Sequence, residues 1–208
     1  MAYTTDEQID ALMREWNRGT TDTVQRALIL TFIKQSERER WSGRNWWFKK
    51  DVVSLSFVQA KTQYDFPATV ADVEAVFDAN GLLMTKLSQR TYDRVYRGTT
   101  VVGTPRNWCV DQIIQATGVI RVRVAPLPSA NSTGAARVEV RSNADSLTDA
   151  SSSASAFPLE ARGLIDNDCL AKMAMHSGSV EKTAYYQARA DREAEELIQE
   201  DIRRQVAA

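Results

Sequence analysis

Hydrophobic residues recur at helical spacing near the beginning of the chain, and this spacing predicts two helices. Thr5 followed by Gln8 forms a capping-box pattern, and four apolar residues follow it at helical spacing: Ile9, Leu12, Met13 and Trp16. Asp22 can cap a second helix over residues 22–40. The apolar residues of this second helix cover more than one stripe, so we expect it to be buried on two sides.

From residue 53 onward the period changes to the alternation that is typical of strands. Asn80-Gly81 lies between two apolar runs and predicts a hairpin with a type I′ turn. Ser88–Tyr96 has one apolar face and predicts a short helix. We expect Ala136–Arg141 to pair with Val119–Ala125 across a polar loop. The other segments with strand character are Val53–Gln59, Tyr64–Pro67 and Trp108–Ile113.

Helical spacing returns after residue 157. Pro158 favours the first turn of a helix, and Ser179 can cap a last helix that runs to about Gln205. The last helix is heavily charged and has only a thin apolar stripe, so we expect it to be exposed or covered by a partner. The preceding stretch, 145–156, consists mostly of Ser, Ala, Asp and Thr and cannot bury enough apolar surface to fold by itself, so we expect a flexible connection.

The pattern predicts an α+β fold: a helical bundle of two N-terminal and two C-terminal helices with an inserted antiparallel β domain. We divide the chain into an N-terminal helical part (1–48), a β domain with a short helix (49–142), a flexible connection (143–157) and C-terminal helices (158–208). The last segment is expected to complete the bundle and to dock on a partner.

Composition narrows the class of protein. The 208 residues carry a net charge of −1, so no global basic field attracts nucleic acid or an anionic membrane. The first residues lack the pattern of a signal peptide, and the apolar run Ala27–Ile33 is too short to cross a bilayer. Cys109 and Cys169 are far apart, which indicates two free thiols in a reduced compartment. We expect no membrane partner.

No residue pattern points to catalysis. His176 is the only histidine, and a triad or a zinc site needs further partners for it. Asp166 and Asp168 are two positions apart on a predicted helix, so they face different sides. No glycine-rich phosphate loop is present in the sequence. We therefore assign no catalytic, cofactor-binding or metal-binding residue and expect that the protein is not an enzyme.

Aromatic residues gather where the helical pattern ends: Trp41, Trp46, Trp47 and Phe48. Such large side chains usually anchor the packing of elements, so we predict that they form a structural aromatic joint. The alternative is a nucleic-acid-binding module, because basic residues interleave with these rings in the manner of single-strand binders. Those basic residues are Arg38, Arg40, Arg44, Lys49 and Lys50.

Taken in order, four stretches resemble the head-to-tail adaptor, or connector, proteins of tailed bacteriophages, in particular the tail tubular A-type adaptors of short-tailed phages. They are the helical start leading to Arg40–Phe48, the strand Tyr64–Pro67, the turn Gly103–Trp108, and Ile120–Pro128. The charged pair of C-terminal helices completes the likeness, which covers most of the chain.

The resemblance implies a non-enzymatic virion protein that forms a ring of twelve copies between the portal protein and the tail or nozzle protein. The genomic DNA would pass through the lumen of the ring without sequence-specific binding. The protein would be made in the host cytoplasm and end in the neck of the virion. Another minor tail or tail-completion protein is the alternative. By position, 197–208 would dock on the portal, with these candidates: Leu197, Ile198, Ile202, Arg203 and Arg204.

Overall fold

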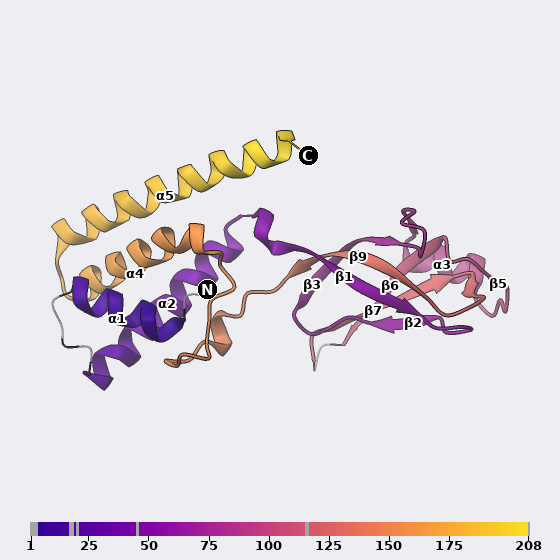
Figure 1. Ribbon diagram of the computed structural model, residues 1–208, viewed down its shortest axis with the longest axis horizontal. Coiled ribbons are helices and arrows are strands. Elements are labelled where there is room, and N and C mark those ends of the chain that lie inside the picture. The colour runs from indigo at the N-terminus through magenta and orange to yellow at the C-terminus, as the bar shows by residue number, and fades with distance from the viewer. Residues whose placement is uncertain (1–3, 17–18, 20, 45, 115–116, 208) are drawn as a thin grey trace. The chain divides into compact units, whose positions relative to one another are not determined.

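The computed structural model of the protein describes residues 4–16, 19, 21–44, 46–114 and 117–207 (Figure 1). It combines five α-helices with antiparallel and mixed sheets, which confirms the α+β class. The chain divides into two compact units. The helical unit comprises 1–48 and 142–208, two segments that are separated in sequence by the β unit, 49–141.

Four helices pack together in the helical unit: α1 (Thr5–Glu15), α2 (Thr23–Ser42), α4 (Arg162–His176) and α5 (Val180–Ala207). Helix α4 packs against each of the other three, and α1 also packs against α2. The capping box of α1 uses Thr4 and Glu7, one residue earlier than predicted. Asp22 caps α2 as predicted, because its side chain accepts hydrogen bonds from two backbone N–H groups of the first turn.

One hydrophobic core fills the helical unit. The largest fully buried contributions come from α1, α2 and α4, and they include Ile9, Met13, Ile33, Leu164 and Leu170. Helix α2 turns one face to this core, whereas Val24 near its start is 74% exposed. The prediction that α2 is buried on two sides is therefore wrong for the chain taken by itself.

The β unit is built from three sheets and one helix, α3 (Gln89–Tyr96), which Ser88 caps. The three-stranded sheet has the order β1-β9-β3, the four-stranded sheet β2-β7-β6-β4, and the small sheet β5-β8. The strands are β1 (Lys50–Phe57), β2 (Gln63–Asp65), β3 (Val70–Phe77), β4 (Thr85–Lys86), β5 (Val102–Gly103), β6 (Asn107–Ile114), β7 (Val119–Ala125), β8 (Leu127–Pro128) and β9 (Ser132–Val140).

One predicted strand pairing is wrong, and a predicted hairpin is formed only in part. Strand β9 pairs with β1 and β3, and not with β7, which lies between β2 and β6. The predicted hairpin after β3 forms only a turn and a single bridge between Phe77 and Leu83. Gly81 alone of the two turn residues has a positive φ, so the turn is not type I′. The next strand, β4, belongs to the four-stranded sheet, where it runs parallel to β6.

The two larger sheets share a core that includes Phe57, Val73, Trp108, Ile120 and Val138. The alternation predicted for β7 is correct, because Ile120, Val122 and Val124 are all buried in this core. Alternation thus identified which residues of a strand face inward, but it did not identify the strand's partner.

The segment 142–157 packs on the helical unit through two buried side chains. Leu147 is 1% exposed, and Phe157 belongs to the same core. The Asn143 side chain donates to the carbonyl of Ala154 and accepts from the N–H of Ala156, which ties the segment to itself. The segment thus adds buried side chains to the helical core, which its average composition did not indicate. Two short 3₁₀ helices, η2 (Ala144–Ser146) and η3 (Leu159–Ala161), lie in or after it.

Candidate docking site

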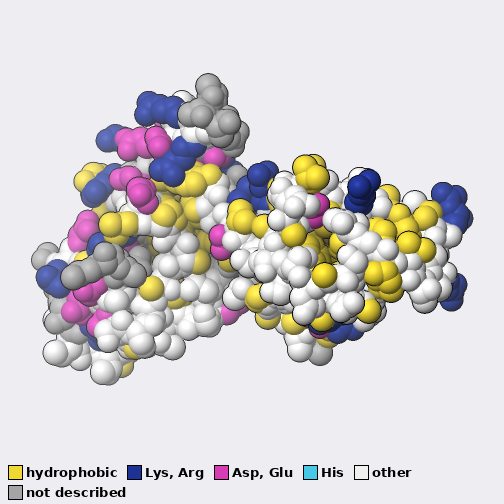
Figure 2. Space-filling model, turned by 45° about the vertical axis from the view of Figure 1, so that its right-hand side comes forward, with side chains coloured by type: hydrophobic (Ala, Val, Ile, Leu, Met, Phe, Trp, Pro, Cys, Tyr) yellow, Lys and Arg dark blue, Asp and Glu magenta, His cyan; other side chains and the backbone are white. Residues whose placement is uncertain are grey.

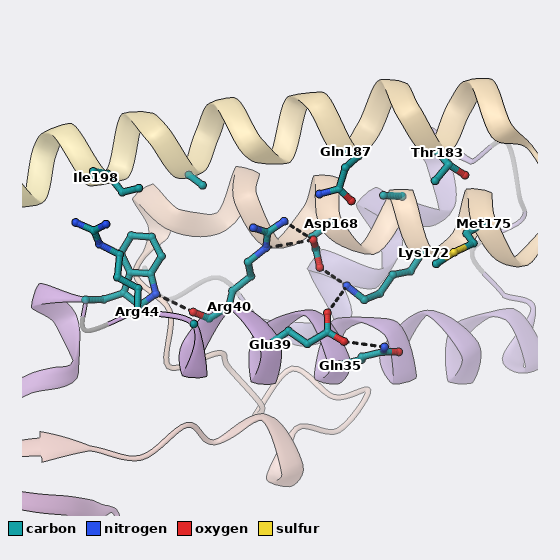
Figure 3. A pocket seen from close by; sticks show the side chains of 14 residues that line it. Gln35, Glu39, Arg40, Arg44, Asp168, Lys172, Met175, Thr183, Gln187 and Ile198 are labelled. Atoms are coloured by element: carbon teal, nitrogen blue, oxygen red, sulfur yellow. Dashed lines mark hydrogen bonds and ion pairs between the residues drawn. The ribbon is translucent and has the colours of Figure 1, made fainter.

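A groove of about 650 Å³ runs between α2 and α5 in the helical unit, with α4 as its floor (Figure 3). Gly43, Ala171 and Ala194 contribute little side-chain volume to its lining, so the helices leave space between them. Polar side chains from all three helices point into it, as Figure 3 shows. We call this space the inter-helix groove. Its other lining residues are Gln35, Glu39, Arg40, Arg44, Trp46, Asp168, Lys172, Met175, Thr183, Gln187 and Ile198.

Four charged side chains form a connected network inside the inter-helix groove. Arg40 donates to Asp168 at 2.6 Å, Lys172 also donates to Asp168, and Lys172 lies 3.0 Å from Glu39. Burial by itself would raise the pKa of Asp168, but the hydrogen bonds from Lys172 and Arg40 lower it below its ordinary value. Asp168 is therefore a buried and fully paired carboxylate that holds α2 against α4.

The predicted aromatic residues lie within the helical unit. Trp46 is 3% exposed, stacks on Phe48 with ring centroids 5.7 Å apart, and donates its indole N–H to the carbonyl of Arg40. Trp41 is also buried and meets Phe157 edge to face at 5.3 Å. Trp47 is half-buried against the same core. These side chains pack on one another and on Phe157, which the sequence did not associate with them.

The predicted docking residues of α5 differ in exposure. Leu197 is 6% exposed and belongs to the core, and Ile198 is partly buried and lines the inter-helix groove. Ile202 is 46% exposed, and Arg203 and Arg204 are exposed as well. With α5 in this position, only Ile202, Arg203 and Arg204 therefore have side chains that a partner could contact.

The end of α5 is attached to the segment that follows α2. The Arg204 guanidinium lies 4.8 Å from the ring centroid of Trp47, and Arg44 lies 3.9 Å from the buried carboxylate of Asp201. A cation over an indole ring is attracted by the negative face of the ring. The docking candidates and the aromatic cluster, which the sequence analysis treated separately, are thus in direct contact.

His176 and the acidic pair of α4 have ordinary structural roles. His176 ends α4, and its ring meets that of Phe32 at 5.8 Å. Asp166 accepts hydrogen bonds from Gln8 and Arg162, so it does not share a partner with Asp168. Among the residues that the structure describes, no group of three or more His, Cys, Asp or Glu side chains could hold a metal ion.

Both thiols are buried. Burial raises the pKa of Cys109 and, more strongly, that of Cys169, so both sulfurs stay protonated and are poor nucleophiles. Within the same described ranges, no helix combines the length and the apolar character needed to cross a bilayer.

Sequence reasoning missed Glu37, which lies in α2 and is 0% exposed. Burial raises its pKa to about 7, and the nearby Ser155 side chain opposes that rise only in part. It also missed the pairing of Arg40 and Lys172 on Asp168. The i,i+4 spacing of Asp168 and Lys172 was the one available signal, because such pairs lie on the same side of a helix.

The fold and the groove define an α+β protein of two units, with paired buried charges between the helices of one of them. The comparison with protein families gives the class a name. The model of the SU10 adaptor protein family matches residues 3–208, so the chain belongs to this family of bacteriophage adaptor proteins. As a phage adaptor it is a component of the virion. No curated protein matches the chain.

Proposed function

We propose that the protein is a head-to-tail adaptor that forms a ring between the portal and the tail of the virion, in its neck. The observation that carries this proposal is the match of the SU10 adaptor family over nearly the whole chain. The ring would have twelve copies, and the genome would pass through its lumen. The helical unit would dock on the portal, and the β unit would face the tail or nozzle protein.

The exposed end of α5 supports the portal-docking part of the proposal. Ile202 and Arg203 present an apolar and a cationic group side by side, a combination that is enriched in protein interfaces. The contact of Arg204 with Trp47 joins side chains that are not fully buried, so it costs little to exchange for a contact with a partner.

The charge of the chain is compatible with a conduit for DNA. A strongly basic lumen would hold the genome through its phosphates and slow its passage, whereas this chain has a net charge of −1. The buried positions of Trp41 and Trp46 do not favour the nucleic-acid-binding alternative, because stacking on bases requires an exposed ring.

The test is to mix the purified protein with the portal protein of the same phage and to image the product by electron microscopy. We expect a second ring stacked coaxially on the portal. Ile202→Asp with Arg203→Glu should abolish this product, because both side chains are exposed and the fold does not depend on them. A truncation from Leu197 would be a poorer test, since it removes a core residue.

Leu82→Asp with Arg106→Glu is the matched control, because it also changes one exposed apolar residue and one exposed arginine, but in the β unit. It should leave portal binding intact. A well-folded parent protein that never associates with the portal would contradict the adaptor proposal. Undiminished binding by the α5 variant would contradict only the docking surface.

A further inference from the structure

The positive charge of the β unit resides in four arginines. The unit holds 12 Lys and Arg against 8 Asp and Glu, which gives it a formal charge of +4. Arg90, Arg94, Arg97 and Arg106 are all exposed, and none of them forms an ion pair with another described residue. The remaining charges of the unit cancel, so these four side chains account for its whole excess.

The β unit has one end where the chain enters and leaves, and an opposite end. Lys50, the first residue of β1, pairs with Glu139 near the end of β9, and both strands connect to the helical unit here. At the other end of the same pairing, Phe57 faces Ser132. Gly103 of β5 lines the same hollow as Phe57 and Ser132, so β5 lies at this other end. We call it the distal end of the β unit.

The start of β6 also lies at the distal end. The segment between β6 and β7 includes Gly118. Arg141, which directly follows β9, donates from its guanidinium to the carbonyl of Gly118 at 3.0 Å, so this segment lies at the end where the chain leaves. Asn107, the first residue of β6, is therefore at the distal end, and so is Arg106 directly before it.

Helix α3 is held over the start of β6. The Asn107 side chain donates to the Tyr96 hydroxyl at 2.8 Å, and the Tyr92 hydroxyl donates to the carbonyl of Val124 at 2.7 Å. The three arginines of α3 and its C-cap are spaced i, i+4 and i+7, so they share the side of the helix that faces away from these tyrosines. Together with Arg106 we call them the distal arginines. Figure 1 shows α3 and β5 at the same, right-hand end of the β unit.

Exposed apolar side chains accompany the distal arginines. Leu82, Leu83, Val101 and Val102 are each more than half exposed. The two valines lie in or next to β5, and Leu82 belongs to the turn after β3, whose residue Asn80 lines the same hollow as β5. Figure 2 shows basic and hydrophobic side chains interspersed at the right-hand end of the β unit.

This combination of side chains indicates the kind of partner that the distal end fits. A surface that only contacts phosphates needs cations and polar groups, whereas a protein interface combines arginine with apolar side chains. Arginine forks bind carboxylates in pairs of parallel hydrogen bonds. Four cations without ion partners therefore match acidic residues on a protein, and the exposed leucines and valines match apolar side chains among those residues.

We propose that the distal end of the β unit binds an acidic protein surface with apolar side chains among its carboxylates, presented by the tail component that follows the adaptor. The inference rests on the proposed function, in which the β unit faces the tail or nozzle protein. It adds which end of the unit makes the contact and what chemistry the partner presents. The connections to the helical unit leave from the opposite end of the β unit, so they do not cover this surface.

The test uses the tail or nozzle protein of the same phage, with the adaptor both free and assembled on the portal. Binding is measured by biolayer interferometry at low and at high salt. Leu82→Asp with Arg106→Glu, and separately Arg90→Glu with Arg94→Glu and Arg97→Glu, should each weaken binding of the tail protein more than tenfold. Rings of both variants on the portal should stay intact in electron microscopy. Binding by the parent should weaken as salt rises, because salt screens exposed charges.

Val52→Asp with Arg137→Glu is the matched control. The two residues pair across β1 and β9, both are exposed, and they lie near the end where the chain enters and leaves. The control changes one exposed apolar residue and one exposed arginine, as the variant at Leu82 and Arg106 does, so the net charge changes equally. Its binding of the tail protein should stay within a few fold of the parent value. Circular dichroism verifies that every variant is folded.

Undiminished binding of the tail protein by both distal variants would overturn the proposal, and so would an equal loss in the control. A parent that forms rings on the portal but never binds the tail protein would overturn it and leave portal docking standing. A parent that binds neither protein would overturn the proposed function as well. If the distal variants lose affinity for duplex DNA in fluorescence anisotropy while their binding of the tail protein is unchanged, the distal end is a nucleic-acid surface.

Discussion

The Glu37 carboxyl group is fully buried, has no ion-pair partner among the described residues, and has only the Ser155 side chain nearby to oppose the effect of burial. Asp168 is nearly as buried, but Arg40 and Lys172 both donate to it. The two carboxyl groups therefore respond to burial in opposite ways. The pKa of Glu37 is raised to about 7, and that of Asp168 is lowered.

The raised pKa of Glu37 makes stability depend on pH. The folded state binds a proton that the unfolded state has already released above its ordinary pKa of 4.5, so stability falls as pH rises from about 4.5 to about 7. The loss from this group is up to about 3 kcal/mol. Glu37→Gln, which cannot ionise, should unfold at higher urea than the parent at pH 8 and at similar urea at pH 5.

Urea denaturation of both proteins between pH 5 and pH 8 measures this difference. Comparison with the variant is the control, because other titrating groups such as Asp166 contribute equally to both proteins. Parallel pH profiles for parent and variant would show that Glu37 is not protonated in the folded state.

Among the aromatic residues of the cluster, Trp46 is the one whose replacement should lower the free energy of unfolding most. Its ring is buried, stacks on Phe48 and donates a hydrogen bond, so Trp46→Ala leaves a cavity and an unpaired carbonyl at Arg40. We expect the free energy of unfolding to fall by about 3–5 kcal/mol. Trp47→Ala at the half-buried neighbour should cost clearly less, and equal losses at the two positions in denaturant titrations would contradict this picture.

At the scale of elements, a close approach between strands is possible only because residue 134 is glycine. A Cβ atom at Gly134 would lie 2.6 Å from Cε2 of the Phe57 ring and even nearer to the carbonyl oxygen of Phe77. Both neighbours lie on the strands that flank β9. Gly134→Ala must therefore push β9 away from β1 and β3.

We expect Gly134→Ala to destabilise the β unit by about 1–3 kcal/mol. Thermal unfolding followed by the near-ultraviolet signal of Trp108, the tryptophan of the β unit, measures the loss. Gly19→Ala is the matched control, because a Cβ atom there would meet nothing within 4 Å. A variant at Gly134 as stable as this control would refute the argument.

The elements that the sequence predicted well are those specified by local pattern. Ser88 and the apolar side of Tyr92 and Tyr96 identified α3, and alternation identified β7 from its first to its last residue. The pairing of β9 was missed because alternation states which side of a strand is buried and not which strand lies next to it. Burial of Leu147 was missed because one apolar residue in a Ser-rich stretch hardly changes its composition.

The candidate site was only partly visible in the sequence. The outward residues of α5, such as Ile202, could be named from its charged pattern. The burial of Leu197 on the same helix could not be predicted from that pattern, because it depends on how α5 packs on α4.

For the whole molecule, two separate cores predict two separable unfolding events. Each unit contains one cysteine with no exposed surface: Cys109 in the β unit and Cys169 in the helical unit. Neither thiol should react with a labelling reagent while its own unit is folded, because burial blocks access and keeps the sulfur protonated. In pulsed thiol labelling along a urea gradient, read by peptide mass spectrometry, the two cysteines should become reactive at different urea concentrations.

Addition of Glu37→Gln should shift only the midpoint of Cys169 at pH 8, which assigns that transition to the helical unit. Coincident labelling of Cys109 and Cys169 in both proteins would mean that the two units unfold as one.

The order of the units along the chain has a consequence for synthesis on the ribosome. The core of the helical unit requires α4, which emerges only after the whole β unit has been made. At about 5–20 residues per second, α1 and α2 wait several seconds with their apolar faces uncovered, while the β unit can already fold. A chain that terminates early thus yields a folded β unit without a helical partner, and only a chain translated through α5 carries a complete helical unit.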